Sequence, residues 1–272
     1  MLVLLPPSEG KSSAPQGAPA LDLGALVAAD VLIARREAML AALAKVSARP
    51  DAAAVLKVGP SLAAEVAANT GLATAPAAPA SEIYTGVLYA AAGLATLDPA
   101  VAARAEQSVR IFSALWGIVA PGDRIPAYRF SMGVDLPGHG RTAAGWREPL
   151  AAALDDRARR EVVVDARSAA YAAAWQPPRG TESVTVRVVR ETAGVRTVVS
   201  HHAKHTRGVL VGHLLRRSGP APADASGVLN AATELVGTVI ATEVASGREH
   251  RLLDATLTPA ARGRAVLELV IG

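Results

Sequence analysis

The residues best suited to chemistry gather in one stretch, between Tyr84 and Gly133. Both Phe, three of the four Tyr and one of the three Trp lie there, although aromatic residues make up only 3% of the chain. Arginines lie among these rings at Arg110, Arg124 and Arg129. Rings beside guanidinium groups suit contact with a phosphate, a base or a nucleotide. A core segment with a few surface arginines would give the same pattern, so the residues alone leave both interpretations open.

Asp123, in the same stretch, is the candidate catalytic residue. It is close in sequence to Tyr128 and Arg129, and a carboxyl group there could serve as a general acid or base. It could also stabilise a cationic sugar during cleavage of a glycosidic bond. The simpler interpretation is that Asp123 caps the turn that follows it. One function class is therefore an enzyme acting on a nucleobase, nucleoside or nucleotide.

Lys11 follows a short apolar run and is a candidate anion contact. The order of strand, Gly10, Lys11 and Ser12 suggests a phosphate-binding P-loop. That motif needs a glycine five residues before Gly10, where the chain has Leu5. We therefore reject a P-loop, and Lys11 is either an anion contact or a solvated turn lysine.

A second basic stretch runs from residue 201 to residue 217, with four His, one Lys, three Arg and no acidic residue. Lys204 and Arg207 are candidate anion contacts there. His201 and His205 stand four apart, which would suit zinc on a helix. No acidic residue or cysteine lies nearby to complete such a site, so we expect no metal and no cofactor.

Hydrophobic periodicity predicts the elements that position these residues. Strands are predicted at residues 2–5, 161–165, 181–190, 195–200 and 265–271. Helices are predicted at residues 21–47, 61–69, 82–97, 98–107, 142–154 and 209–217. Residues 109–115 fit a strand or a helix end, followed by a hairpin. Together these elements indicate an α+β fold with one mixed sheet surrounded by helices, in a single domain over residues 1–272.

The amino-acid composition limits the classes of function that this chain can have. The net charge is +4, and because the chain has only four lysines, arginine carries nearly all of the positive charge. Arginine presents a planar fork that suits phosphate, although this modest charge is weak evidence for a nucleic-acid partner. The absence of cysteine excludes disulfides, thiolate chemistry and peroxide sensing by a thiol. With no signal-peptide pattern and no long apolar run, we expect a cytoplasmic protein without membrane contact.

Several segments occur in the order found in one known family. They are Leu4 to Lys11, Tyr84-Thr85-Gly86, Ser113 to Gly117, Pro121-Gly122-Asp123, Pro126 to Gly133 and Ser200 to Gly208. In this order they resemble the YaaA-type peroxide stress response protein family, over roughly residues 1–215. One residue is inserted between Pro126 and Tyr128 relative to the family pattern. The last fifty-odd residues match that pattern poorly.

The resemblance implies a DNA-binding protein that limits damage by peroxide and iron. It implies a single-domain fold with a basic cleft and a helix-hairpin-helix motif, whose glycine step would be Gly117-Ile118-Val119. Partners would be duplex or damaged DNA, or a nucleotide-like small molecule, with Trp116 or Tyr128 stacking on an exposed base. The residues expected around the cleft are Lys11, Arg110, Trp116, Gly117, Asp123, Tyr128, Arg129, Lys204 and Arg207.

Overall fold

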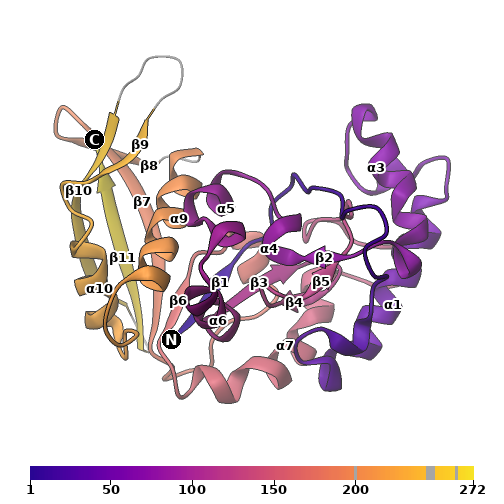
Figure 1. The fold of residues 1–272 in the computed structure, drawn as a ribbon, viewed down its shortest axis with the longest axis horizontal. Helices are drawn as coiled ribbons and strands as arrows, with labels where there is room; N and C mark the ends of the chain where they lie inside the picture. The colour runs from indigo at the N-terminus through magenta and orange to yellow at the C-terminus, as the bar shows by residue number, and fades with distance from the viewer. Residues whose placement is uncertain (199–200, 243–248, 261–262) are drawn as a thin grey trace.

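The computed structural model describes residues 1–198, 201–242, 249–260 and 263–272. Within these ranges, nine strands form one mixed sheet, accompanied by ten α-helices (Figure 1). The strands are β1 (Leu2–Leu5), β3 (Val109–Ser113), β4 (Gly117–Val119), β6 (Val163–Asp165), β7 (Ser183–Thr192), β8 (Val195–Val198), β9 (Val239–Thr242), β10 (Glu249–Pro259) and β11 (Arg264–Ile271). A separate two-stranded ladder joins β2 (Ala78–Pro79) to β5 (Arg124–Ile125).

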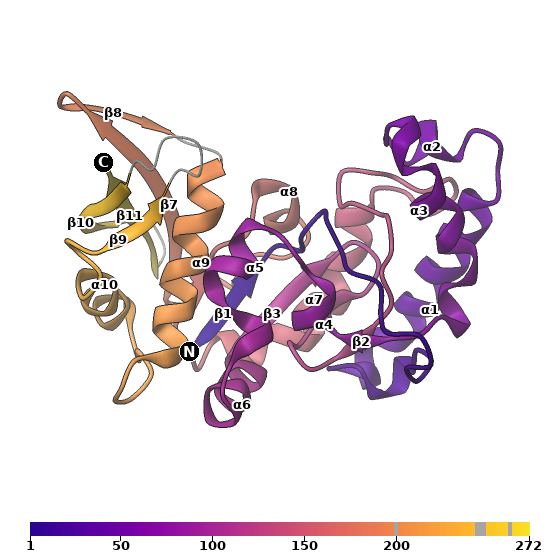
Figure 2. The same ribbon diagram turned by 45° about the horizontal axis from the view of Figure 1, so that its top comes forward.

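The helices are short apart from α1, α7 and α9. Their bounds are α1 (Ala29–Ser47), α2 (Ala52–Val55), α3 (Ala63–Ala68), α4 (Ala80–Ile83), α5 (Val87–Ala92), α6 (Pro99–Ser108), α7 (Thr142–Ala158), α8 (Ala169–Ala172), α9 (His201–Arg216) and α10 (Ala225–Thr233). Helices α1 to α3 lie at one end of the molecule and strands β7 to β11 at the other (Figures 1 and 2). None of the described helices combines the length and apolar composition needed to span a bilayer.

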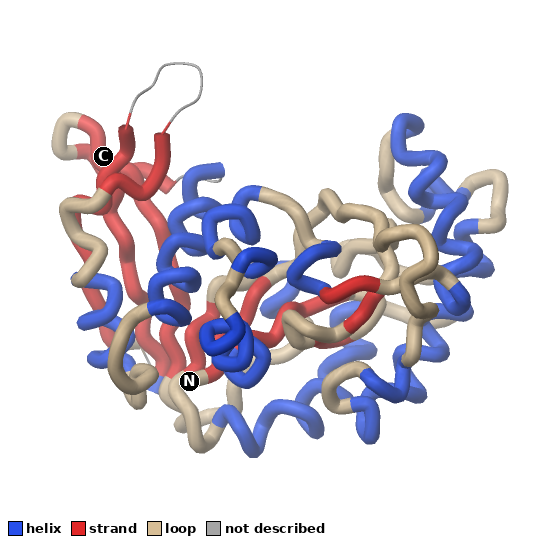
Figure 3. Tube along the Cα trace, in the orientation of Figure 1, coloured by secondary structure: helices blue, strands red, loops and turns tan. Residues whose placement is uncertain are grey.

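The strand order is β4-β3-β1-β6-β7-β11-β10-β9, with β8 paired to β7. Strands β3, β1, β6, β7 and β11 are parallel, and the remaining pairs are antiparallel. Figure 3 shows the strands in red and the helices in blue. This arrangement confirms the predicted mixed sheet with helices around it. All four residues of β1 are buried, as expected for a parallel strand covered on both faces.

Strand β1 occupies a central position in the parallel part of the sheet. It pairs with β3 on one side and β6 on the other, so that Leu4 aligns with both Arg110 and Asp165. The carboxyl ends of β1, β3 and β6 therefore meet at one edge of the sheet. In open α/β sheets, ligands bind at this kind of edge, where successive connections leave a strand in opposite directions.

Helix α9 packs against β7 and α5 packs along α9. A Cβ placed on Gly208 of α9 would lie only 2.2 Å from the carbonyl oxygen of Leu88 in α5. Only glycine permits this approach, which gives a structural reason for the glycine at the end of the motif between residues 200 and 208. Residues 199–200, which begin that motif, lie outside the described residues.

Several predicted helices have different bounds in the structure. The helix expected at residues 82–97 is divided, because the Tyr84-Thr85-Gly86 turn separates α4 from α5 and a 3-10 turn follows at Leu94–Thr96. The helix expected from residue 21 begins at Ala29, because Ala28 adopts a left-handed conformation with φ of 53° after a short 3-10 turn at Leu23–Ala25. Helix α9 begins at His201 rather than after Gly208. The predicted cap of α6 is confirmed, since the Asp98 carboxylate accepts hydrogen bonds from two backbone N–H groups of the first turn.

The structure does not show the expected helix-hairpin-helix. Gly117-Ile118-Val119 forms β4, which pairs antiparallel with β3. Gly117 has a φ of +73°, and a Cβ placed there would lie 2.6 Å from the Trp146 ring of α7. The glycine therefore serves a tight β-turn under a tryptophan and does not direct N–H groups at a phosphate.

Candidate functional site at the carboxyl ends of β1, β3 and β6

Two motifs that are far apart in the sequence form one unit at this edge. The turn after β1 brings Lys11 into an antiparallel bridge with Tyr84. The Thr85 backbone N–H donates to the Gly10 carbonyl oxygen at 3.3 Å. Gly86 has a φ of +140° and a Cβ there would crowd the same turn, so this tight pairing depends on glycine. The amine of Lys11 is thereby held beside the Tyr84 ring.

Lys11 is a half-buried amine with aromatic neighbours. Its Nζ donates to the Ser8 carbonyl oxygen at 2.9 Å and lies 4.4 Å from the ring centroid of Tyr128 and 5.7 Å from that of Tyr84. Burial, reinforced by the nearby charge of Arg129, lowers the pKa of Lys11 to about 7. Near neutral pH, a large fraction of this amine is therefore uncharged.

Three hydroxyl groups lie in contact next to this amine. The hydroxyl of Tyr128 is 2.9 Å from that of Tyr84 and 2.7 Å from Ser113 Oγ. Ser113 Oγ also accepts the backbone N–H groups of Leu115 and Trp116, at 3.1 and 3.0 Å. Burial raises the pKa of both tyrosines well above the ordinary value, so both phenols are neutral at physiological pH. We call Ser113, Tyr128 and Tyr84 the hydroxyl cluster.

The other two tyrosines join the same region. The Tyr89 hydroxyl donates to the Pro6 carbonyl oxygen at 2.7 Å, and its ring centroid is 5.4 Å from that of Tyr84. Burial raises the pKa of Tyr171 to about 12, and its hydroxyl interacts electrostatically with Tyr84 and Tyr128. All four tyrosines of the chain therefore surround the turn that carries Lys11.

A buried ion pair closes the β6 side of the edge. Arg167 donates from Nε and Nη2 to the two carboxylate oxygens of Asp165, at 2.9 and 2.7 Å. Its guanidinium lies 4.2 Å from the Phe112 ring centroid. Arg207 of α9 donates to the Val186 carbonyl oxygen at 3.1 and 2.9 Å. These arginines already have partners, and they fix the edge in place.

Of the residues predicted from sequence, Lys11 and Tyr128 come together here, with Arg129 close by. The Arg129 guanidinium forms an ion pair with Glu65, with Nε 2.9 Å from a carboxylate oxygen. Trp116 packs edge-on against Tyr128 with 5.8 Å between ring centroids, and it is fully buried. Neither Trp116 nor Tyr128 offers an exposed ring on which a base could stack.

Asp123 belongs to a different set of contacts. Its carboxylate accepts the backbone N–H of Val27 at 3.1 and 3.0 Å and that of Ala120 at 2.8 Å. The buried guanidinium of Arg36 acts on it from nearby, while burial raises the pKa of Asp123. This carboxylate ties two loops together through Val27 and the preceding Ala120, and the bonds differ from the expected cap of the turn that follows.

The remaining predicted cations lie apart from one another. Arg110 donates to the carbonyl oxygens of Glu106 and Val109, near the amino end of β3. Lys204 is exposed on α9. Within the described part of the chain, the predicted cationic residues therefore do not form one basic cleft.

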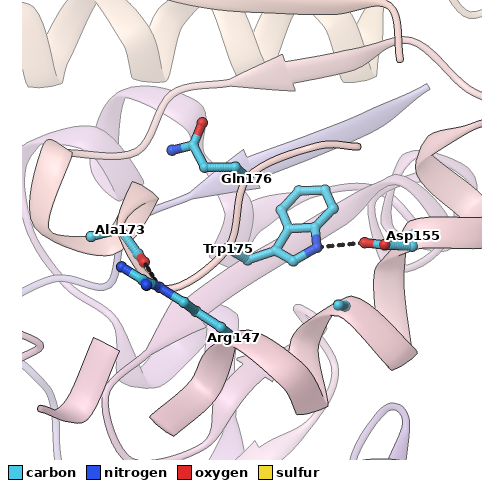
Figure 4. Close-up of a pocket in the computed structure, with 6 residues that line it drawn as sticks. Arg147, Asp155, Ala173, Trp175 and Gln176 are labelled. Atoms are coloured by element: carbon cyan, nitrogen blue, oxygen red, sulfur yellow. Dashed lines mark hydrogen bonds between the residues drawn. The ribbon is translucent and has the colours of Figure 1, made fainter. Parts of the chain in front are cut away.

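A pocket of about 290 Å³ lies between α7 and the segment after α8 (Figure 4). Its polar groups already bond to one another: Trp175 Nε1 donates to Asp155 at 2.9 Å and Arg147 Nε donates to the Ala173 carbonyl at 3.2 Å. The Trp175 ring also packs 5.6 Å from the Arg167 guanidinium. This pocket supports the β6 side of the edge but does not contain the Lys11 amine.

No three His, Asp or Glu side chains converge to hold a metal ion in the described ranges. The side chain of His201, one half of the predicted pair, lies outside the described residues. The groups around Lys11 are an amine and hydroxyls, which are poor ligands for zinc and iron without further donors.

Sequence reasoning missed the roles of Tyr84, Ser113, Tyr89 and Tyr171. Tyr84 and Ser113 lie inside two of the motifs, but the motifs alone do not show that their hydroxyls meet through Tyr128. The small number of tyrosines, three of them in one stretch, was the available signal.

Comparison with known proteins identifies the family. A family model described as "Peroxide stress protein YaaA" matches residues 1–228. The chain belongs to the YaaA peroxide stress protein family. This confirms the resemblance found in the motifs.

YaaA-family relatives in several bacteria match this chain. A UPF0246 protein of Streptomyces coelicolor is 48% identical over 258 residues, covering 93% of this chain and 97% of the relative. A UPF0246 protein of Corynebacterium efficiens is 38% identical, covering 93% and 98%. An uncharacterized protein of Campylobacter jejuni is 31% identical over about half of each chain. The names of these relatives state no ligand and no reaction.

Proposed function

We propose that this YaaA-family protein is an enzyme that acts on a nucleobase, nucleoside or nucleotide at the carboxyl ends of β1, β3 and β6. The observation that carries the proposal is the Lys11 amine, which has a pKa of about 7 and lies against the Tyr84 and Tyr128 rings. A base is most effective when its pKa is near the working pH, and a surface lysine does not meet that condition. Lys11 does meet it.

The surroundings of Lys11 favour an anionic ligand. Arg129 contributes a second positive charge, which Glu65 neutralises only in part because that carboxylate is about half exposed, at 49%. A phosphate next to Lys11 and Arg129 would raise the pKa of the amine by favouring its charged form. The neutral phenols could donate to a ligand oxygen, so the site can supply both a proton acceptor and a proton donor.

The test is ligand binding followed by turnover. Thermal shift and calorimetry would screen nucleobases, nucleosides and nucleotides against the wild type, Lys11→Met and the exposed control Lys45→Met. We expect one ligand class to stabilise the wild type and Lys45→Met but not Lys11→Met, with turnover that rises with pH through about 7. Binding that is equally strong in Lys11→Met would refute this role.

We propose DNA binding as a second candidate function, in line with a role against peroxide damage. It is supported by a net charge of +4 carried almost wholly by arginine. Contacts would be between cations and phosphates, because Trp116 and Tyr128 are buried and cannot stack on a base in this structure.

Fluorescence anisotropy with duplex, single-stranded and abasic oligonucleotides across a salt series tests this candidate. We expect affinity to fall steeply with salt, and the slope to decrease by about one in Lys204→Ala or Arg129→Ala. An affinity that does not respond to salt, or no binding at low salt, would exclude it.

A further inference from the structure

We propose that Lys11 Nζ forms a Schiff base with an aldehyde on an anionic ligand of the open-chain sugar phosphate class, and that the hydroxyl cluster protonates the aldehyde oxygen. This inference rests on the proposed function and names a substrate class for the same site. It assigns Lys11 as a nucleophile, which goes beyond its role as a proton acceptor.

The contacts of Lys11 leave the lone pair of the amine available. The neutral amine has two hydrogens, and Nζ lies 2.9 Å from the Ser8 carbonyl oxygen and 3.5 Å from that of Glu9. Two donated hydrogen bonds account for both hydrogens, so the lone pair is directed away from these carbonyls. The carboxylates of Glu65 and Glu9 raise the pKa of the amine, but among the described residues none of them forms an ion pair with Nζ.

A count of the protons in the hydroxyl cluster identifies the group that can act as the acid. Ser113 Oγ accepts two backbone N–H groups, so both of its lone pairs are used and its own proton must be donated to Tyr128. The bond between Tyr128 and Tyr84 uses one phenolic proton. Whichever of the two donates, the other phenolic proton is left for an acceptor outside the cluster. An aldehyde oxygen is such an acceptor, and because both phenols are buried, it reaches them when the turn that carries Lys11 moves on ligand binding.

The reaction balances without an oxidant or a metal. The Nζ lone pair adds to the aldehyde carbon, the C=O π electrons move to oxygen, and that oxygen takes a proton from the cluster. The nitrogen loses a proton, which restores the phenol, and a carbinolamine is formed. The nitrogen lone pair then forms the C=N bond as the hydroxyl group takes a second proton from the cluster and leaves as water. The resulting iminium returns its N–H proton to the phenolate, which gives the imine.

Lys11 and Arg129 together indicate the chemical class of the ligand. Arg129 lies close enough to Lys11 to lower its pKa, so the Arg129 guanidinium can hold an anion while the neutral Lys11 amine adds to the aldehyde. The sugar of a nucleotide carries both a phosphate and, once its glycosidic bond is cleaved, an aldehyde at the anomeric carbon. An open-chain sugar phosphate therefore provides a phosphate for Arg129 and an aldehyde for Lys11.

Reductive trapping on the full chain tests the proposal. The probe is 2-deoxyribose 5-phosphate with cyanoborohydride at neutral pH, followed by intact-mass measurement and peptide mapping. We expect one covalent adduct on Lys11, formed faster than adducts on the exposed Lys45, Lys57 and Lys204, and absent in Lys11→Arg. Adducts distributed equally over the exposed lysines, or unchanged in Lys11→Arg, would overturn it.

Two further variants test the acid. Tyr84→Phe removes one hydroxyl while keeping the ring, and Ser113→Ala removes the donor at the other end of the cluster. Each should slow trapping on the order of ten-fold or more. The circular dichroism spectrum should stay the same, and unfolding should remain cooperative. Unphosphorylated 2-deoxyribose should label more slowly than the phosphate, because it lacks the anion. If neither variant changes the trapping rate, the assignment of the acid is wrong.

The outcome also separates this inference from the proposed function. If Lys11 is never trapped but Lys11→Met abolishes nucleotide binding and turnover, the Schiff base is excluded and the acid–base role stands. If Lys11 is trapped although no nucleotide is bound or turned over, the nucleophile is established and the nucleotide-acting enzyme is not.

Discussion

Lys11 and Arg36 are both cations brought into the interior, and their surroundings differ. Arg36 of α1 is fully buried and donates to three backbone carbonyl oxygens at distances up to 3.0 Å. Burial lowers the pKa of Arg36 to about 10 while Asp123 opposes the shift. Lys11 has two carbonyl contacts and the added repulsion of Arg129, and its pKa falls to about 7.

The difference shows that burial of a charge does not by itself indicate a functional site. Arg36 remains charged and holds the hairpin between β3 and β4 against α1, because carbonyls and a carboxylate compensate for its lost hydration. Lys11 has less compensation, from two carbonyl oxygens and the carboxylates of Glu65 and Glu9, and titrates near neutral pH at the edge where we propose that a ligand binds. The number and kind of partners therefore distinguish a structural cation from a reactive one.

The largest expected effect is the loss of the Arg36 side chain. Arg36→Met should lower the free energy of unfolding by about 3–5 kcal/mol, because it leaves the carboxylate of Asp123 buried without its compensating charge. Urea denaturation at pH 7 measures this. Lys11→Met is the matched comparison and should not destabilise the protein at pH 7, because it removes an amine that binds its proton less tightly in the folded state. Equal losses in the free energy of unfolding of the two variants would contradict the distinction between a structural and a titrating cation.

The second-largest expected loss of stability concerns the hairpin between β3 and β4, which Arg36 holds. Gly117→Ala should cost about 2–4 kcal/mol, since the residue has a φ of +73° and the new methyl group would meet the Trp146 ring at 2.6 Å. Gly133→Ala is the control, because nothing lies within 4 Å of a Cβ there. Thermal denaturation of both variants measures the difference, and a mild Gly117→Ala would show that the hairpin relaxes easily.

A smaller loss is expected for the carboxylate beside Arg36. Asp123→Ala should cost about 1–3 kcal/mol, because the N–H groups of Val27 and Ala120 lose their acceptor. Asp22→Ala, which removes one exposed cap bond, should cost less than about 1 kcal/mol. If turnover is found, a stable Asp123→Ala that has lost it completely would restore Asp123 as a catalytic candidate.

The last effect is the pH dependence contributed by Lys11, which is measured as a change of stability with pH and not as the cost of a substitution. Its pKa is about 7 in the folded protein, against 10.5 for an ordinary lysine, so the unfolded chain binds more protons between these values. Stability from this group should therefore rise as the pH increases from about 7 toward 10.5 and stay constant below 7. Urea midpoints at pH 6, 8 and 10 should show this rise in the wild type and in Lys45→Met but not in Lys11→Met. A rise of the same size in Lys11→Met would contradict the lowered pKa.

The elements that could be predicted depend on local signals. The four apolar residues of β1, the Asp98-Pro99 start of α6 and the β7–β8 hairpin follow from patterns within a few residues. The helix-hairpin-helix could not be tested locally, because a glycine followed by two β-branched residues fits a strand equally well. The contact between Gly117 and Trp146 decided the outcome, and it joins residues about thirty positions apart.

The site could be predicted only in part, for a similar reason. The motifs contain Lys11 and Tyr128, but the hydroxyl cluster exists only because Tyr84, Ser113 and Tyr128 arrive from three separate segments. Arginine composition was misleading, because a guanidinium group that suits phosphate also suits backbone carbonyls. Arg110 and Arg207 both bind carbonyl oxygens in this fold.

The central place of β1 has a consequence for synthesis of the chain. Leu2–Leu5 leaves the ribosome well before its partners, residues 109–111 and 163–165. At bacterial rates of about 5–20 residues per second, the second partner follows roughly ten to thirty seconds later. For that period an apolar strand with two unpaired edges is exposed to other chains. A chaperone that binds short apolar segments should therefore capture the nascent chain until β6 has emerged.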